Sequence, residues 1–136
     1  MPKTLLAVDD SVTMRKALEI TFSGDDFRVL TADGPAAALA KAGEADVFVV
    51  DTILGGDDGD ALAKELRRAR PGAAIVLLTS RYNPHDQGKA RDAGADDFAD
   101  KPFDTQQLLD KVRKAIVAKE SSPQAAATNS VWPGWS

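Results

Sequence analysis

The positions of apolar residues along the chain predict five short strands, each followed by a helix. Three apolar runs, at residues 4–8, 47–50 and 74–78, contain no alternating polar positions, which is typical of strands buried on both faces of a parallel sheet. Two further strands are expected at residues 27–31 and 97–100. The lack of alternation predicts a sheet that is covered on both faces.

Apolar residues recur at helical spacing between these strands. The spacing predicts helices over residues 12–23, 35–42, 59–69 and 84–93, and a fifth helix after residue 103. The fifth is strongly amphipathic, with an inner face expected to contain Leu108, Leu109, Val112, Ile116 and Val117.

Local residue chemistry marks the ends of these elements. Asp10 or Ser11 suits the N-cap of the first helix, and Pro35 suits the first turn of the second. Gly43 is expected to end that second helix. Residues 52–59 are rich in glycine and aspartate, so we expect a loop there.

A strand–helix unit repeated five times is typical of the α/β class. Right-handed crossovers make such a chain a doubly wound parallel sheet with helices on both faces, and the connections are too short for a barrel of eight units. We therefore expect one domain over residues 1–120. Residues 121–136, rich in Ser and Ala, cannot form a core and are expected to be a flexible linker or tail.

Composition narrows the classes of function. The chain has 136 residues, a formal net charge of -4 and no Cys. The acidic balance argues against direct binding to nucleic acid, which requires a clustered Lys and Arg surface. Without Cys there is no thiolate catalysis and no Cys-based zinc site. The first apolar run is too short for a signal sequence or a membrane span, so we expect a cytoplasmic protein without membrane contact.

Reactive polar residues follow four of the expected strands. Asp9 and Asp10 follow the first strand, Asp51 the third, Thr79 the fourth and Lys101 the fifth. These side chains are expected to meet, because open α/β sheets bind ligands at the carboxyl ends of their strands. Three neighbouring carboxylates repel one another, and an oxygen-liganded cation such as Mg²⁺ removes that conflict. A carboxylate beside Mg²⁺ and a Lys is also suited to aspartyl-phosphate chemistry.

In this order and spacing the residues resemble the receiver domain of two-component response regulators, and are closest to the single-domain chemotaxis regulators. The resemblance covers residues 4–119 and implies a flavodoxin-like fold with strand order 2-1-3-4-5. It rests on Val8-Asp9-Asp10-Ser11, Asp51, Gly59, Thr79-Ser80 and Lys101-Pro102-Phe103.

The resemblance implies a phosphoacceptor and a cofactor. Asp51 corresponds to the residue that takes a phosphoryl group from a partner histidine kinase. Asp9 and Asp10, together with Asp51 and the backbone carbonyl of Ile53, correspond to the ligands of Mg²⁺, Asp10 more directly than Asp9. Any catalysis is limited to the domain's own phosphorylation and dephosphorylation.

The resemblance also implies a conformational switch. Lys101 corresponds to the lysine that pairs with phosphate, and the bond from Lys101 to Pro102 is expected to be cis. Thr79 corresponds to the switch hydroxyl and Phe98 to the switch aromatic, although Phe98 is equally suited to the core. Phosphorylation would shift the surface of the fourth helix, fifth strand and fifth helix, which contacts a downstream protein target or output domain.

Three positions depart from the family pattern. Leu54-Gly55-Gly56 stands where the family usually has a Met-Pro or Leu-Pro pair, which predicts a looser loop. Ile53 and Arg81 stand where polar and acidic residues are common. Because both can shield an acyl phosphate from water, we expect a moderately long-lived phosphoryl state.

Three other classes of function are less consistent with these residues. A receiver-like adaptor that docks without phosphorylation is left open by the altered loop, although the complete set of acids, Thr and Lys argues against it. A haloacid-dehalogenase-type enzyme requires a second acid two residues after its nucleophile, where this chain has Ile53. A dinucleotide-binding domain requires a Gly-x-Gly-x-x-Gly motif after the first strand, and none is present.

The remaining polar candidates have simpler interpretations. Asp57, Asp58 and Asp60 are expected to form a solvated acidic surface, since their spacing is not that of an EF-hand. His85, the only His, is expected to be exposed and uninvolved. Both Trp residues lie in the tail, as a docking motif or a linker fragment.

Overall fold

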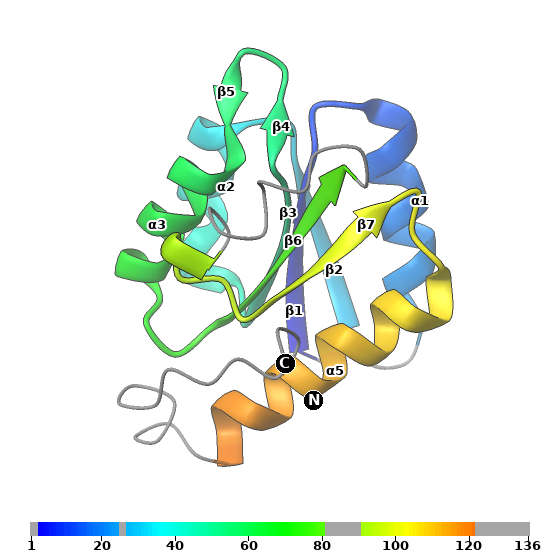
Figure 1. The fold of residues 1–136 in the computed structure, drawn as a ribbon, viewed down its shortest axis with the longest axis vertical. Helices are drawn as coiled ribbons and strands as arrows, with labels where there is room; N and C mark the ends of the chain where they lie inside the picture. The colour runs from blue at the N-terminus through cyan, green and yellow to red at the C-terminus, as the bar shows by residue number, and fades with distance from the viewer. Residues whose placement is uncertain (1–2, 25–26, 81–90, 122–136) are drawn as a thin grey trace.

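The computed structural model describes residues 3–24, 27–80 and 91–121 (Figure 1). Its main sheet has five parallel strands in the order β2-β1-β3-β6-β7, which confirms the expected order 2-1-3-4-5. The strands are β1 (Lys3–Val8), β2 (Phe27–Ala32), β3 (Val47–Asp51), β6 (Ala74–Ser80) and β7 (Asp97–Lys101). The helices are α1 (Val12–Phe22), α2 (Pro35–Lys41), the 3₁₀ helix η1 (Ala42–Glu44), α3 (Gly59–Ala69) and α5 (Thr105–Ser121).

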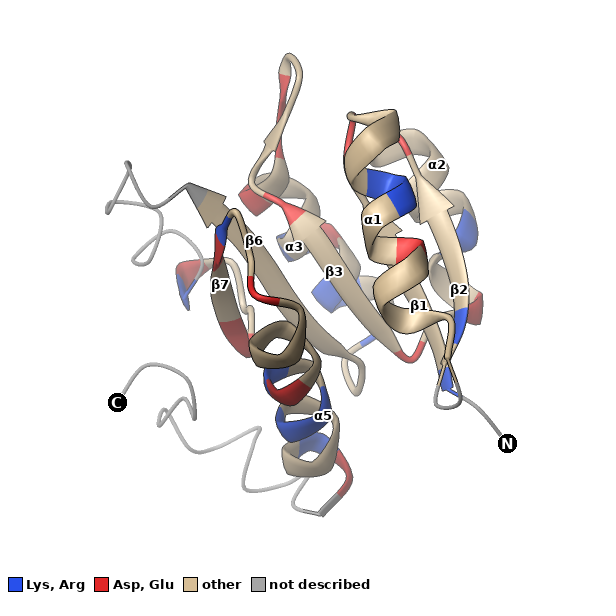
Figure 2. Cartoon of the chain, turned by 90° about the vertical axis from the view of Figure 1, so that its right-hand side faces the viewer, with Lys and Arg blue, Asp and Glu red and all other residues tan. Residues whose placement is uncertain are grey.

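Helices cover both faces of this sheet (Figures 1 and 2). Along β1, Leu5 and Ala7 face the core shared with α1 and α5, whereas Leu6 and Val8 face the core shared with α2 and α3. All four side chains are fully buried. The apolar runs lack alternation because each strand has a hydrophobic environment on both sides.

Most helix predictions are confirmed within a residue or two. Ser11 is the N-cap of α1, and its hydroxyl oxygen accepts from the Met14 N–H at 3.2 Å. Val117 was expected on the inner face of α5 but is 59% exposed. The helix predicted over residues 84–93 falls largely outside the described residues. Among the helices that are described, none is long and apolar enough to cross a membrane.

The prediction of a loop over residues 52–59 is wrong. This segment forms a small antiparallel hairpin of β4 (Ile53–Leu54) and β5 (Asp57–Asp58), which projects beyond the carboxyl end of the sheet (Figure 1). Gly55 takes a φ of 63° in the turn, a backbone conformation that favours glycine. Gly43 does not end α2 in the left-handed region either, because the chain continues into η1.

The prediction of a solvated acidic surface is wrong for one of its three residues. Asp57 and Asp58 are exposed, but Asp60 is only 7% exposed. Asp58 is the N-cap of α3, and its carboxylate accepts from the Asp60 N–H at 2.8 Å. The cap starts the helix so that its first turn packs against the sheet, which buries Asp60 in spite of its charge.

Candidate functional site

Asp51 ends β3, the central strand of the sheet. Its side chain is only 3% exposed, and its Oδ1 accepts from the Ile53 N–H at 2.9 Å. Its Oδ2 lies 2.5 Å from the Nζ of Lys101. One buried carboxylate is thus oriented by a backbone amide on one oxygen and by an ammonium group on the other.

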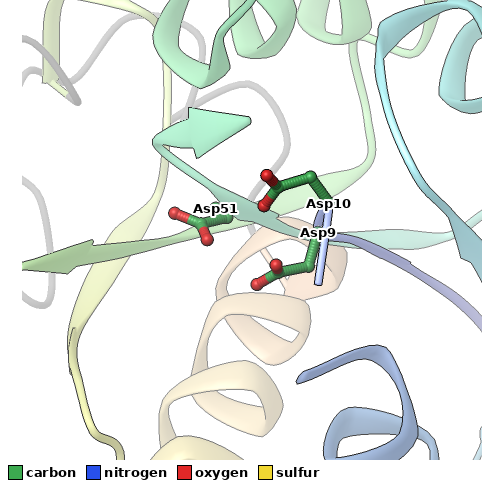
Figure 3. Close-up of side chains that lie close together, drawn as sticks. All are labelled: Asp9, Asp10 and Asp51. Atoms are coloured by element: carbon green, nitrogen blue, oxygen red, sulfur yellow. The ribbon is translucent and has the colours of Figure 1, made fainter. Parts of the chain in front are cut away.

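Asp9 and Asp10 lie beside Asp51, in the connection from β1 to α1. The ligand oxygens of the three carboxylates all lie within 4.8 Å of one another, and the side chains converge at the strand ends (Figure 3). Asp9 is fully buried and its Oδ1 accepts from the Ser11 N–H at 2.9 Å, while Asp10 is exposed. The structure therefore brings together the three acids that the sequence predicted to meet.

Lys101 and Thr79 come from neighbouring strands, because Thr79 pairs with Asp100 and Ser80 with Lys101 in the register of β6 and β7. Thr79 is 2% exposed, and its hydroxyl donates to Asp100 Oδ1 at 3.2 Å. The bond from Lys101 to Pro102 is cis, as expected. Asp100 was not singled out in the sequence, since an acid before a Lys carries no signal of a hydroxyl partner on another strand.

The acid cluster is electrostatically strained. The Nζ of Lys101 lies 3.9 Å from Asp9 Oδ2, beyond hydrogen-bond distance, so one ammonium faces two buried carboxylates. Burial first, and then the carboxylate of Asp51, raise the pKa of the Asp9 carboxyl to about 7, against the opposing Ser11 N–H and Lys101. The cluster holds more negative charge than the described residues around it compensate.

These residues fit a divalent cation. Asp9 Oδ2 is buried and accepts no hydrogen bond from the described part of the chain. A buried oxygen in that state carries a desolvation cost that a cation or its bound water relieves. Three carboxylates with no nitrogen or sulfur donor suit a hard ion such as Mg²⁺, which keeps several waters.

Four further residues singled out in the sequence are Phe98, Ile53, Arg81 and His85. Phe98 is half-buried against the core under α2 and α3, and the Nζ of Lys111 lies 5.7 Å from its ring centroid. The Ile53 side chain is 55% exposed although its amide contacts Asp51. Arg81 and His85 lie outside the described residues.

Replacing Asp9 with Asn is expected to stabilise the metal-free fold by about 1 to 3 kcal/mol at pH 8. The Asn carbonyl oxygen can still accept from the Ser11 N–H, while one buried negative charge is removed. Because the raised pKa of Asp9 lets the wild type relieve the repulsion by protonation, the advantage should shrink as the pH falls from 8 towards 4.

Urea unfolding followed by circular dichroism in the presence of a chelator measures this difference. Asp57→Asn is the matched control, since Asp57 is exposed and should leave stability unchanged. An Asp9→Asn variant less stable than the wild type at pH 8 would contradict the account of a strained cluster.

A parallel sheet of order 2-1-3-4-5, with acids at two neighbouring strand ends and a Lys at the edge strand, is the arrangement expected from the resemblance to receiver domains. The family model described as response regulator receiver domain matches residues 5–113 of this chain. The chain therefore belongs to the receiver-domain family of two-component response regulators, which confirms the resemblance seen in the sequence.

Curated relatives agree with this assignment. The chain is 31% identical over 132 residues to the response regulator MprA of Mycolicibacterium vanbaalenii, covering 96% of this chain and 56% of that protein. It is 30% identical over 129 residues to the DNA-binding dual master transcriptional regulator RpaA of Synechocystis, covering 93% of this chain and 54% of that protein. The chain thus spans about half the length of the curated relatives it matches.

Solved structures show the same fold. A putative response regulator from Chloroflexus aurantiacus is 30% identical with a TM-score of 0.80, covering 86% of this chain and 99% of that one. Chemotaxis protein CheY4 of Vibrio cholerae is 28% identical with a TM-score of 0.79, covering 85% and 99%. A CheY-like receiver domain from Methanospirillum hungatei shares the fold with a TM-score of 0.82 over 90% and 99%, at 22% identity.

Proposed function

We propose that Asp51 is the phosphoacceptor of this receiver domain and that a histidine kinase supplies the phosphoryl group. The observation that carries the proposal is the setting of Asp51, a buried carboxylate at the end of the central strand, paired with Lys101 and within 4.8 Å of two further acids. An adaptor that never accepts phosphate has no need for this costly cluster of buried charges.

The chemistry is an in-line displacement at phosphorus. A carboxylate oxygen of Asp51 forms the new bond to phosphorus, while the bond from phosphorus to the imidazole nitrogen breaks and that nitrogen keeps the electron pair. Lys101, already on Asp51 Oδ2, would pair with the phosphoryl oxygens. Asp9, Asp10, Asp51 and the Ile53 carbonyl would hold Mg²⁺, which when bound adds positive charge opposite those oxygens.

The proposed readout starts at Thr79. Its hydroxyl now donates to Asp100, and a phosphoryl group on Asp51 would compete for that hydroxyl. A change there reaches β7, the strand that also contains Phe98. We propose that this change moves the Phe98 side chain. The movement would alter the surface of β7 and α5 that a partner protein or an output domain contacts.

The partners and location follow from this proposal. Two curated relatives have names that include DNA binding, and this chain spans about half of their length, so an output domain that binds DNA is one candidate target. The receiver itself would act by protein contact. We place it in the cytoplasm, because DNA-binding relatives act where bacterial DNA lies.

Acetyl phosphate and Mg²⁺ test the proposal without a known kinase. We expect intact-mass measurements to show one phosphoryl group per chain, and reductive trapping with peptide mapping to locate it at Asp51. Labelling should be lost when the metal is chelated. Labelling at another residue, or unchanged labelling under chelation, would exclude the proposed site.

Ile53 provides a prediction about the lifetime of the phosphoryl state. Its exposed side chain lies two residues after Asp51, so it can hinder the water that would attack the phosphoryl group. Ile53→Asn is expected to shorten the half-life of the phosphorylated chain several-fold. Ile20→Asn, which changes another exposed apolar residue, on α1, is the control. Equal half-lives in all three chains would show that Ile53 does not protect the phosphoryl group.

A further inference from the structure

The β4–β5 hairpin is held at both of its ends. Ile53 pairs with Asp58 and Leu54 with Asp57 in its antiparallel register. Leu54 is only 3% exposed and packs in the core beneath α2 and α3. At the other end Gly59 donates its N–H to the Thr52 carbonyl at 3.0 Å. The hairpin cannot easily move away from the strand ends, so the position of its turn is set by the fold.

The turn lies against Asp10. A Cβ atom built on Gly55 would lie 3.3 Å from Asp10 Oδ2, closer than most contacts of real Cβ atoms. The carboxylate of Asp10 is exposed, and no hydrogen bond within the described residues orients it. A side chain at position 55 would therefore meet this carboxylate.

We propose that Gly55 is a positioning residue for the divalent cation. Because it has no side chain, the turn can close beside Asp10 while that carboxylate stays directed towards Asp9 and Asp51. This inference rests on the proposed metal site and adds the element that shapes it. In the turn formed here, where Gly55 has a φ of 63°, a side chain at position 55 would be directed at the Asp10 carboxylate and would weaken the metal site.

The neighbouring glycine provides a matched control. Gly56 belongs to the same turn, but a Cβ built on it meets no atom within 4 Å and its φ is not positive. Gly55, in contrast, combines a φ of 63° with the contact to Asp10. Substitution at the two positions thus separates the approach to Asp10 from a general change to the hairpin.

The test is Mg²⁺ affinity, measured by calorimetry and by amide shifts in NMR spectra of the full chain. Gly55→Ala is expected to weaken Mg²⁺ binding about tenfold, in the range found when residues that orient metal ligands are changed. Gly56→Ala should bind within about twofold of the wild type. Thermal unfolding without Mg²⁺ checks that both variants are folded.

A second variant separates backbone strain from the contact with Asp10. Asn tolerates a positive φ but has a Cβ atom, so Gly55→Asn should also lose affinity if the contact is responsible. It also replaces Gly55→Ala should that variant fail to fold. Equal Mg²⁺ affinity in Gly55→Asn and Gly56→Ala would overturn the inference.

A failure of the underlying metal site has a different signature. If the wild type shows no saturable Mg²⁺ binding, or if Asp10→Asn binds as tightly as the wild type, the proposed metal site itself is wrong. If the wild type binds, Asp10→Asn does not, and the two Gly55 variants match Gly56→Ala, only the role of Gly55 is wrong.

Discussion

Replacing Asp51 with Asn is expected to lower phosphoryl capture from acetyl phosphate by about three orders of magnitude or more. The amide has no charged oxygen to attack phosphorus, and it no longer pairs with the Lys101 ammonium. The substitution is nearly isosteric, and the Asn carbonyl oxygen can still accept from the Ile53 N–H. Intact-mass measurement over time, in Mg²⁺, follows the loss.

Asp57→Asn is the control for this variant. Asp57 is an exposed acid on β5, six residues after Asp51. The Asp57→Asn variant should therefore be phosphorylated at Asp51 to the same extent as the wild type. Circular dichroism should show that both variants are folded. Full labelling of Asp51→Asn would show that another residue is the acceptor.

Gly59→Ala is expected to destabilise the fold by more than about 3 kcal/mol. A Cβ on Gly59 would lie 2.0 Å from the carbonyl oxygen of Asp51 and 2.6 Å from the Cα of Thr52. Both atoms belong to the backbone where β3 ends, and β3 is paired with β1 and β6, so neither can move at low cost. Because the clash falls on Asp51 itself, phosphoryl capture should fall as well.

Urea unfolding by circular dichroism measures the loss, with Gly43→Ala as the control. A Cβ on Gly43 meets no atom within 4 Å and its φ is not positive, so this variant should be as stable as the wild type or slightly more stable. A Gly59→Ala variant within about 1 kcal/mol of the wild type would contradict the close approach of α3 to the end of β3.

The strands and the meeting of the acids could be predicted because they depend on local pattern. Runs such as residues 47–50 have no polar interruptions, and a residue that follows such a run must lie at the carboxyl edge of a parallel sheet. The order of the strands could not be predicted from local pattern. Which strand lies beside which is not encoded in any single run, and here the order came from the resemblance to a family.

The hairpin could not be predicted by the same reasoning. Strands of two residues, as in β4 and β5, are too short to show a period, and glycine and aspartate favour turns. The close approach of Gly55 to Asp10 involves two segments far apart in the sequence, so no local pattern predicts it. The altered segment that predicts a looser loop instead forms a hairpin beside the acids.

The burial and hydrogen-bond partners of two acidic residues could not be predicted from the sequence either. Asp60 was expected at the surface, but it lies in the first turn of α3, after the N-cap Asp58, and is buried. Nothing in the sequence marks Asp100 as a partner of Thr79, because the two residues meet only through the pairing of β6 and β7. In both cases tertiary packing decides the environment, and residue type alone does not reveal it.

The most direct test of the central claim is NMR of the wild type and Asp51→Asn with beryllofluoride and Mg²⁺, since beryllofluoride mimics a phosphoryl group on a carboxylate. We expect the wild type to show Mg²⁺-dependent shifts of the amides around Asp51, Thr79 and Lys101, extending along β7 into α5. Asp51→Asn should show none of them. Unchanged spectra in the wild type, or the same shifts in both chains, would contradict the assignment of Asp51 as the phosphoacceptor.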